Sequence, residues 1–131
     1  MPVVEKPPVA DKPAVPRTPR DSLREARRLR RQDPDAALKM IATALAAKPG
    51  DGGALLLKAQ ILLDQDRTKD ALNAADEALA SDKSNADAWR MRGKILIDRE
   101  PEQARKALVR YLELRPDAPD ADTIRSAIDS L

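Results

Sequence analysis

Residues 86–116 read ADAWRMRGKILIDREPEQARKALVRYLELRP, and this stretch decides the fold. Trp89, Gly93 and Leu96 follow one another at spacings of four and three residues, which is the spacing of one face of a helix. Residues 98–101 form a polar turn, and a second run with helical spacing comes after it: Ala104, Leu108, Tyr111 and Leu112. The stretch therefore predicts two helices joined as a hairpin.

The same hairpin occurs twice upstream at a constant period. The small residue of the first helix falls at Ala26, Ala59 and Gly93, in steps of 33 and 34 residues. The small residue that opens the second helix falls at Ala37, Ala71 and Ala104, in steps of 34 and 33. The position between hairpins falls at Pro49, Lys83 and Pro116, again in steps of 34 and 33. This period predicts three repeats at about 21–49, 50–83 and 84–116, named repeats one, two and three below.

The two ends of the chain differ from the repeats. Six of the eleven prolines fall at positions 2, 7, 8, 13, 16 and 19 without a periodic apolar face, which predicts a disordered arm or linker over residues 1–20. A docking site for a proline-reading module is the alternative interpretation of this arm. Residues 117–131 place Ile124 and Ile128 on one helix face and aspartates on the other, which predicts a capping helix that solvates the open end of repeat three.

These hairpins resemble those of the tetratricopeptide repeat family, whose unit is about 34 residues long. Repeat three carries the match most fully, with Trp89, Gly93, Leu96, Ala104, Leu108, Leu112 and Pro116. Repeat two departs from the family pattern at Ala75 and Lys83, and repeat one departs from it at Ser22. The resemblance covers about residues 21–116. It implies an all-α fold, a right-handed superhelix of three helical hairpins followed by a C-terminal capping helix.

The composition of the 131 residues excludes several classes of chemistry. The chain has no Cys and no His, so it cannot build a disulfide, a thiolate or imidazole metal site, or histidine-based acid/base catalysis. Neighbouring carboxylates such as Asp76-Glu77 fit a solvated helix surface, and the glycine-rich residues 50–53 follow a helix rather than a strand. We therefore expect no enzyme activity, no metal and no cofactor.

Positive charge is concentrated in one segment. Residues 17–31 contain seven Arg and two carboxylates, whereas the rest of the chain sums to about −3. Arg24, Arg27, Arg28 and Arg31 surround the predicted first helix, which has no aromatic residue for stacking on bases. This arrangement argues against nucleic-acid binding and membrane contact, and it favours solvation of the N-terminal repeat combined with partner binding.

The resemblance also implies which side chains line a groove, because in this family the first helices of successive repeats form a concave surface. Four positions around each small residue would face a bound peptide. These are Leu23, Arg24, Arg27 and Arg30 in repeat one, Leu56, Leu57, Gln60 and Leu63 in repeat two, and Arg90, Met91, Lys94 and Ile97 in repeat three. Such a groove is basic at both ends and aliphatic in the middle, which fits a partner segment with acidic and apolar residues.

One subset of the family binds a C-terminal carboxylate through Lys and Asn at these groove positions. Here Leu23 and Arg27 stand where Lys and Asn are expected in repeat one, and Leu57 stands where Asn is expected in repeat two. The resemblance therefore does not extend to that subset, although Arg27, Arg90 and Lys94 remain candidates for an acidic ligand.

These patterns lead to the hypothesis of a non-enzymatic protein-interaction, adaptor or scaffold module. The alternative is a self-assembling subunit, a homo-oligomer in which the end helices or outer faces pair with copies of the chain. No apolar run is longer than the four residues 54–57, far short of the roughly 20 residues of a membrane span, and the N-terminus lacks the apolar core of a secretory signal. The sequence as written thus predicts a cytoplasmic protein. If it is a fragment of an anchored protein, an envelope-facing or periplasmic domain is the alternative.

Overall fold

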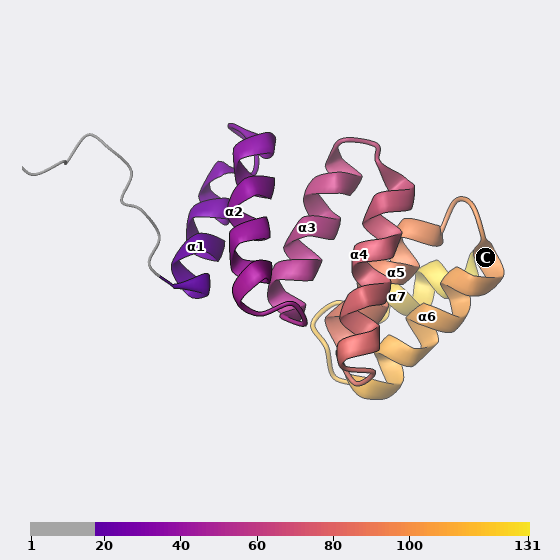
Figure 1. The fold of residues 1–131 in the computed structure, drawn as a ribbon. Helices are drawn as coiled ribbons and strands as arrows, with labels where there is room; N and C mark the ends of the chain where they lie inside the picture. Colours follow the sequence, from indigo (N-terminus) through magenta and orange to yellow (C-terminus); the bar gives the residue numbers. More distant parts are fainter. Residues whose placement is uncertain (1–17) are drawn as a thin grey trace, which may run out of the picture.

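The computed structural model describes residues 18–131, and this part of the chain contains seven helices and no strand. The helices are α1 (Pro19–Leu29), α2 (Pro34–Ala47), α3 (Gly52–Asp64), α4 (Thr68–Ser81), α5 (Ala86–Leu96), α6 (Pro101–Leu114) and α7 (Ala121–Asp129). They follow one another as a row of hairpins, with α1 and α2 at one end and α6 and α7 at the other (Figure 1). The three predicted hairpins and the C-terminal helix are therefore present.

The start of α1 lies inside the range predicted for the proline-rich arm. The side chain of Thr18 accepts a hydrogen bond from the main-chain N–H of Asp21 at 3.1 Å, and Pro19 occupies the first turn. A threonine cap followed by proline at the first helical position is a strong helix start, so the helix begins two residues before the boundary drawn at position 21. Residues 1–17, which carry most of the predicted arm, lie outside the described residues.

Each repeat begins its first helix with a polar cap. Asp51 accepts from the N–H of Ala54 at the start of α3, and Asn85 accepts from the N–H of Ala88 at the start of α5. These caps satisfy main-chain donors that have no partner inside the helix. The short turn between repeats is thereby fixed at the residue where the next hairpin must begin.

The core is built from small side chains. Ala26 and Ala59, the small residues of the first helices in the repeat pattern, have no exposed surface, and Gly93 is buried as well. A Cβ atom at Gly93 would lie 2.5 Å from Cδ2 of Leu108, so only glycine leaves room for that leucine. The two helices of each hairpin pack along their length, and α3 also packs on α5.

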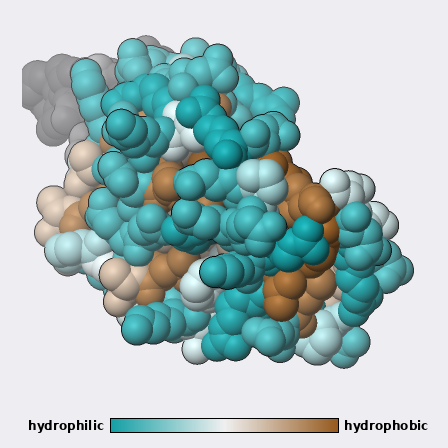
Figure 2. Space-filling view, turned by 90° about the vertical axis from the view of Figure 1, so that its right-hand side faces the viewer, coloured by the Kyte–Doolittle hydropathy of each residue, from teal (hydrophilic) through white to brown (hydrophobic). Residues whose placement is uncertain are grey.

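The C-terminal helix α7 covers α6 only in part. Ala121 is buried and Ile124 packs on the cluster around Tyr111, whereas Ile128 remains half-exposed. Figure 2 shows this end of the molecule, where hydrophobic surface is visible between hydrophilic side chains. The predicted cap is thus present, but it leaves apolar surface exposed beside it.

Within residues 18–131 no helix combines the length and the apolar character that crossing a lipid bilayer requires.

Candidate protein-interaction surface

We call the side of α1, α3 and α5 that carries the predicted groove residues the groove face. Along it α3 packs on α5, one ion pair connects repeats one and two, and another connects repeat three to the segment before α7. Arg30 Nε, just after α1, lies 3.1 Å from Asp64 Oδ2 at the end of α3. Arg90 Nε on α5 lies 2.6 Å from Asp120 Oδ2, just before α7. The structure therefore places α3 and α5 side by side, and it links the end of α1 to the end of α3 through an ion pair.

The N-terminal end of the groove face holds an open depression of about 430 Å³. Arg20, Arg27 and Lys48 contribute three cations to its wall, and Leu23, which is only 7% exposed, contributes apolar surface. None of the three cations forms an ion pair with another described residue. The one carboxylate in the wall, Asp51, is engaged as the cap of α3. This depression therefore carries an excess of positive charge.

Arg20 and Lys48 were not among the predicted groove residues. Arg20 belongs to the arginine-rich segment, and Lys48 ends repeat one, so both stand out in the sequence as charges. Their convergence depends on the turn between α2 and α3, which the repeat register alone does not describe. Arg24, which was predicted to line the groove, is exposed but does not line this depression.

The predicted groove residues of α3 are mostly leucines, and their side chains are shared with the core. Leu56, Leu57 and Leu63 are all half-buried. Leu57 packs on the cluster formed by α1, α2 and α3, whereas Leu56 and Leu63 pack on the cluster that includes Met91 of α5. These leucines offer a partner only the part of their surface that helix packing leaves exposed.

Asp64 connects the basic and aliphatic parts of the groove face. It accepts hydrogen bonds from Arg30 and, at 3.1 Å, from the side-chain amide of Gln60. Although partial desolvation opposes the effect, these two hydrogen bonds and the charges of Arg30 and Lys94 lower the pKa of the Asp64 carboxyl. Asp64 is therefore ionised at neutral pH and offsets the positive charge of Arg30.

The C-terminal end of the groove face is organised by Asp120. Its Oδ1 accepts a 2.6 Å hydrogen bond from the hydroxyl of Tyr111, and its Oδ2 pairs with Arg90. The Tyr111 hydrogen bond is the main cause that lowers the pKa of Asp120, with a further contribution from Arg90. Burial, followed by the Asp120 hydrogen bond, raises the pKa of Tyr111. Asp120 was expected to solvate the capping helix, but it instead joins α5, α6 and α7.

The remaining predicted residues of repeat three have different environments. Met91 is 9% exposed and packs in a core cluster, so it offers a partner little surface. Lys94 is exposed, and Ile97 is half-buried just after α5. Because Arg90 is already paired with Asp120, Lys94 is the predicted cation of this repeat that lacks an ion pair with any described residue. The C-terminal part of the groove face is thus less basic than its sequence suggests.

Comparisons with known proteins agree with this architecture. The family model described as Tetratricopeptide repeat matches residues 28–95, about half of the chain. The solved structure of the first TPR of Spaghetti (RPAP3) bound to the HSP90 peptide SRMEEVD has a TM-score of 0.77 and 19% identity, covering 89% of this chain and 95% of that one. The first TPR domain of human RPAP3 gives a TM-score of 0.76 and 20% identity, with 88% and 96% covered.

A crystal structure of MamA also has this fold, with a TM-score of 0.73 and 18% identity over 88% of this chain and 69% of that one. A sequence comparison with curated proteins gives no match. At these identities the solved structures show the fold alone, and the family model shows the family. The chain is a right-handed superhelix of helical hairpins and belongs to the tetratricopeptide repeat family.

Proposed function

We propose that the chain is a non-enzymatic protein-interaction module that binds an acidic and apolar segment of a partner protein on the groove face. The observation that carries this proposal is the N-terminal depression, where Arg20, Arg27 and Lys48 converge beside Leu23 without an ion-pair partner among residues 18–131. The similar Spaghetti (RPAP3) domain was solved with the peptide SRMEEVD, which has two glutamates, an aspartate, a methionine and a valine.

Charge and burial indicate how such a segment would bind. A carboxylate of the partner would meet the free cations of the N-terminal depression, because Arg30 and Arg90 are already paired with Asp64 and Asp120. Apolar side chains of the segment would lie along the half-exposed leucines of α3. Since the helices of the groove face are held by core packing, binding orders the partner more than the module.

Peptide display is the first experiment. A random library of seven-residue peptides is selected on the full chain and on an Arg27→Glu/Lys48→Glu variant, with Lys39→Glu/Lys69→Glu as a control of equal charge change. All four side chains are exposed. We expect the full chain and the control to enrich peptides with both carboxylates and apolar residues, and the Arg27/Lys48 variant to lose this enrichment. SRMEEVD is added as one defined member.

Three outcomes contradict the proposal: selection of basic peptides, retention of the same peptides by the Arg27/Lys48 variant, or no selection at all. Circular dichroism and thermal melting of each variant exclude unfolding as the cause of lost binding. Light scattering over a range of concentrations tests the alternative of a self-assembling subunit. If mass rises with concentration and the Arg27/Lys48 variant does not change it, assembly through another face accounts for the protein better.

A further inference from the structure

A second depression, of about 760 Å³, lies on repeat three between α5 and α6. Arg92 of α5 lines it and lies two positions from both Arg90 and Lys94. Two residues of a helix are about 200° of rotation, so Arg92 leaves α5 on the side opposite the groove face. We call this depression the outer depression. A ligand bound in it would not occupy the groove.

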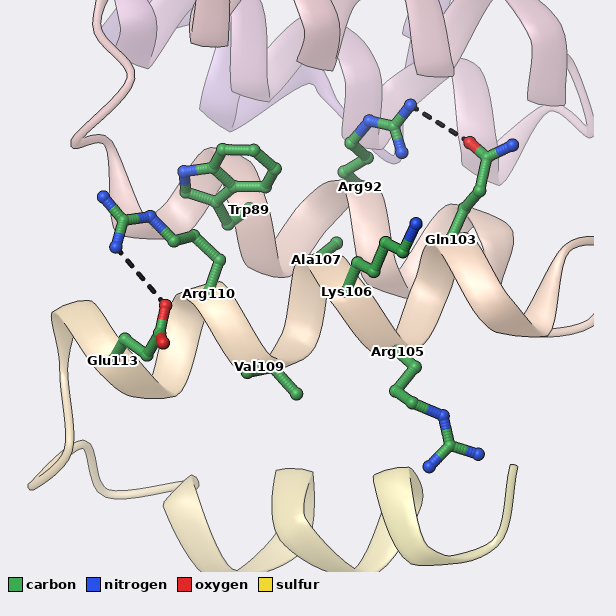
Figure 3. Close-up of a pocket in the computed structure, with 9 residues that line it drawn as sticks. All are labelled: Trp89, Arg92, Gln103, Arg105, Lys106, Ala107, Val109, Arg110 and Glu113. Atoms are coloured by element: carbon green, nitrogen blue, oxygen red, sulfur yellow. Dashed lines mark hydrogen bonds and ion pairs between the residues drawn. The ribbon is translucent and has the colours of Figure 1, made fainter.

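The floor of the outer depression is apolar. The half-buried Trp89 donates its indole N–H to the main-chain oxygen of Lys83 at 2.8 Å, so the ring lines the depression with its polar atom already satisfied. Val109 is 40% exposed, more than any other large hydrophobic side chain among residues 18–131. In Figure 3 Trp89 lies on the α5 side of α6 and Val109 points toward α7, so the depression extends across the outer surface of α6.

The rim is positively charged. Arg92, Arg105, Lys106 and Arg110 line the depression together with one carboxylate, Glu113. Glu113 lies 3.3 Å from Arg110, and Arg92 is paired with Asp76 of α4. Lys106 is exposed and forms no ion pair with any described residue. The surface beside Trp89 therefore has an excess of positive charge.

Repeat two does not share this charge. The equivalent helix of repeat two, α4, also lines an outer depression, which is smaller, about 350 Å³. A step of 33 residues relates α6 to α4. By this step the α6 residues Gln103, Lys106, Ala107 and Arg110 correspond to the α4 residues Asp70, Asn73, Ala74 and Glu77. Two cations of repeat three thus replace a neutral side chain and a carboxylate of repeat two. Solvation of the outer face of the second helix would be served by charges of either sign, so it does not explain why positive side chains replace a neutral and a negative one.

We propose that the outer depression of repeat three binds an acidic amphipathic segment of a partner protein. The apolar face of the segment covers Trp89, Ala107 and Val109, while its carboxylates pair with Lys106 and compete with the exposed Glu113 for Arg110. A tryptophan surrounded by cations is a suitable anchor, because aromatic and arginine side chains contribute strongly to protein interfaces. The positively charged rim favours a partner segment that carries negative charge.

Trp89 makes a direct test possible, because it is the single tryptophan of the chain. Its emission is followed during titration with a tryptophan-free peptide of about 14 residues that places Leu at helical spacing and Glu elsewhere. The matched peptide has Gln in place of every Glu. The protein variants are Lys106→Glu/Arg110→Glu and the control Lys69→Glu/Arg99→Glu, which has the same charge change at exposed sites outside the depression.

We expect the Glu peptide to give a saturable change in Trp89 emission, at least tenfold tighter than the Gln peptide. Binding should weaken at least tenfold in the Lys106/Arg110 variant and remain unchanged in the control, with the same melting temperature. The Arg27→Glu/Lys48→Glu variant should also bind normally, which separates this site from the groove face. Absence of a Trp89 response, equal binding by the Lys106/Arg110 variant, or preference for a single-stranded oligonucleotide over the Glu peptide would each overturn the proposal.

Discussion

Repeats two and three join their two helices through equivalent positions that hold different residues. In repeat two the pair is Ala59 on α3 and Ala75 on α4, and both are fully buried in one cluster. In repeat three the pair is Gly93 on α5 and Leu108 on α6, where Cδ2 and Cγ of the leucine lie 2.5 and 2.6 Å from the place of the missing glycine Cβ. A methyl group lost on one helix is thus matched by a larger side chain on the other.

This difference shows that the repeat constrains the combined size of the two facing side chains rather than the residue at either position. Interiors are packed so closely that a change of one methyl group must be met by a neighbour. Ala75 departs from the bulky residue that the family pattern places on the second helix, yet its partner retains a Cβ that fills part of the space. The departure is therefore compensated within the hairpin, which keeps the helices of repeat two in register with those of repeat three.

The largest effect is expected for Leu108→Ala. Leu108 is 2% exposed, and its truncation leaves a cavity beside Gly93, which has no side chain to fill it. We expect the free energy of unfolding to fall by about 3 kcal/mol, measured by urea denaturation. Leu79→Ala serves as a control in repeat two, because Leu79 is 8% exposed and does not face a glycine. An equal or greater loss for Leu79→Ala would contradict the special dependence on Gly93.

A smaller loss is expected for Gly93→Ala. The new methyl group would overlap Leu108, which costs about 2 kcal/mol, while the higher helix propensity of alanine returns up to about 1 kcal/mol. The double variant Gly93→Ala/Leu108→Ala reproduces the pair of repeat two. Its loss should be smaller than the sum of the two single losses by at least about 0.5 kcal/mol, in a double-mutant cycle. Simple additivity would mean that the two residues do not compensate each other.

The sequence predicted the helices and their small contact residues because both follow from periodic spacing. Trp89 and Leu96 repeat at helical intervals, and Ala26, Ala59 and Gly93 keep the period, so local pattern and repeat length carry this information. Met91, which was predicted to line the groove, is 9% exposed, because a position in the repeat register does not tell how far a side chain turns toward the core. Burial of a residue at the groove edge depends on how neighbouring hairpins rotate.

The ion pairs could not be predicted in the same way. Arg30 and Asp64 are 34 residues apart and Arg90 and Asp120 are 30 apart, and a charge pattern does not state which long side chains meet. The two aspartates make the groove face less basic than a count of its arginines suggests. The sequence also did not predict the depression at Arg20 and Lys48. There a turn brings together positive charges that belong to no common helix face.

A third prediction concerns the second helices of the same two repeats. Tyr111 on α6 occupies the position of Ala78 on α4, and its hydroxyl reaches Asp120 at 2.6 Å. Tyr111→Phe should lower the free energy of unfolding by about 1 kcal/mol at pH 7, because the phenyl ring keeps the packing and loses the hydrogen bond. Melting followed by circular dichroism checks this value. Asp120→Asn, which removes the charge that Arg90 pairs with, should reduce stability in the same direction.

The pH dependence of stability has a definite sign at this site. The pKa of Asp120 is lowered in the folded state, so its contribution is present above the unfolded pKa of about 3.9 and is lost as the pH falls through the lower folded value. The pKa of Tyr111 is raised, so its contribution is present below about pH 10 and is lost at higher pH. Tyr111→Phe should flatten both ends of the profile. An unchanged profile would show that this contact does not stabilise the fold.

The smallest effect is expected in the turns inside the hairpins, where repeats two and three again differ. Asp66 in the turn of repeat two has φ of 60°, the one positive φ at a non-glycine position among residues 18–131. Glycine adopts this conformation without the steric cost that an L side chain carries, so Asp66→Gly should raise the free energy of unfolding by about 0.5 kcal/mol. The same change at Asp98, in the turn of repeat three, should lower it by about 0.5 kcal/mol, because there glycine only adds freedom to the unfolded chain. Urea denaturation of both variants tests the sign, and two losses of equal size would mean that Asp66 offsets its backbone strain through contacts of its own side chain.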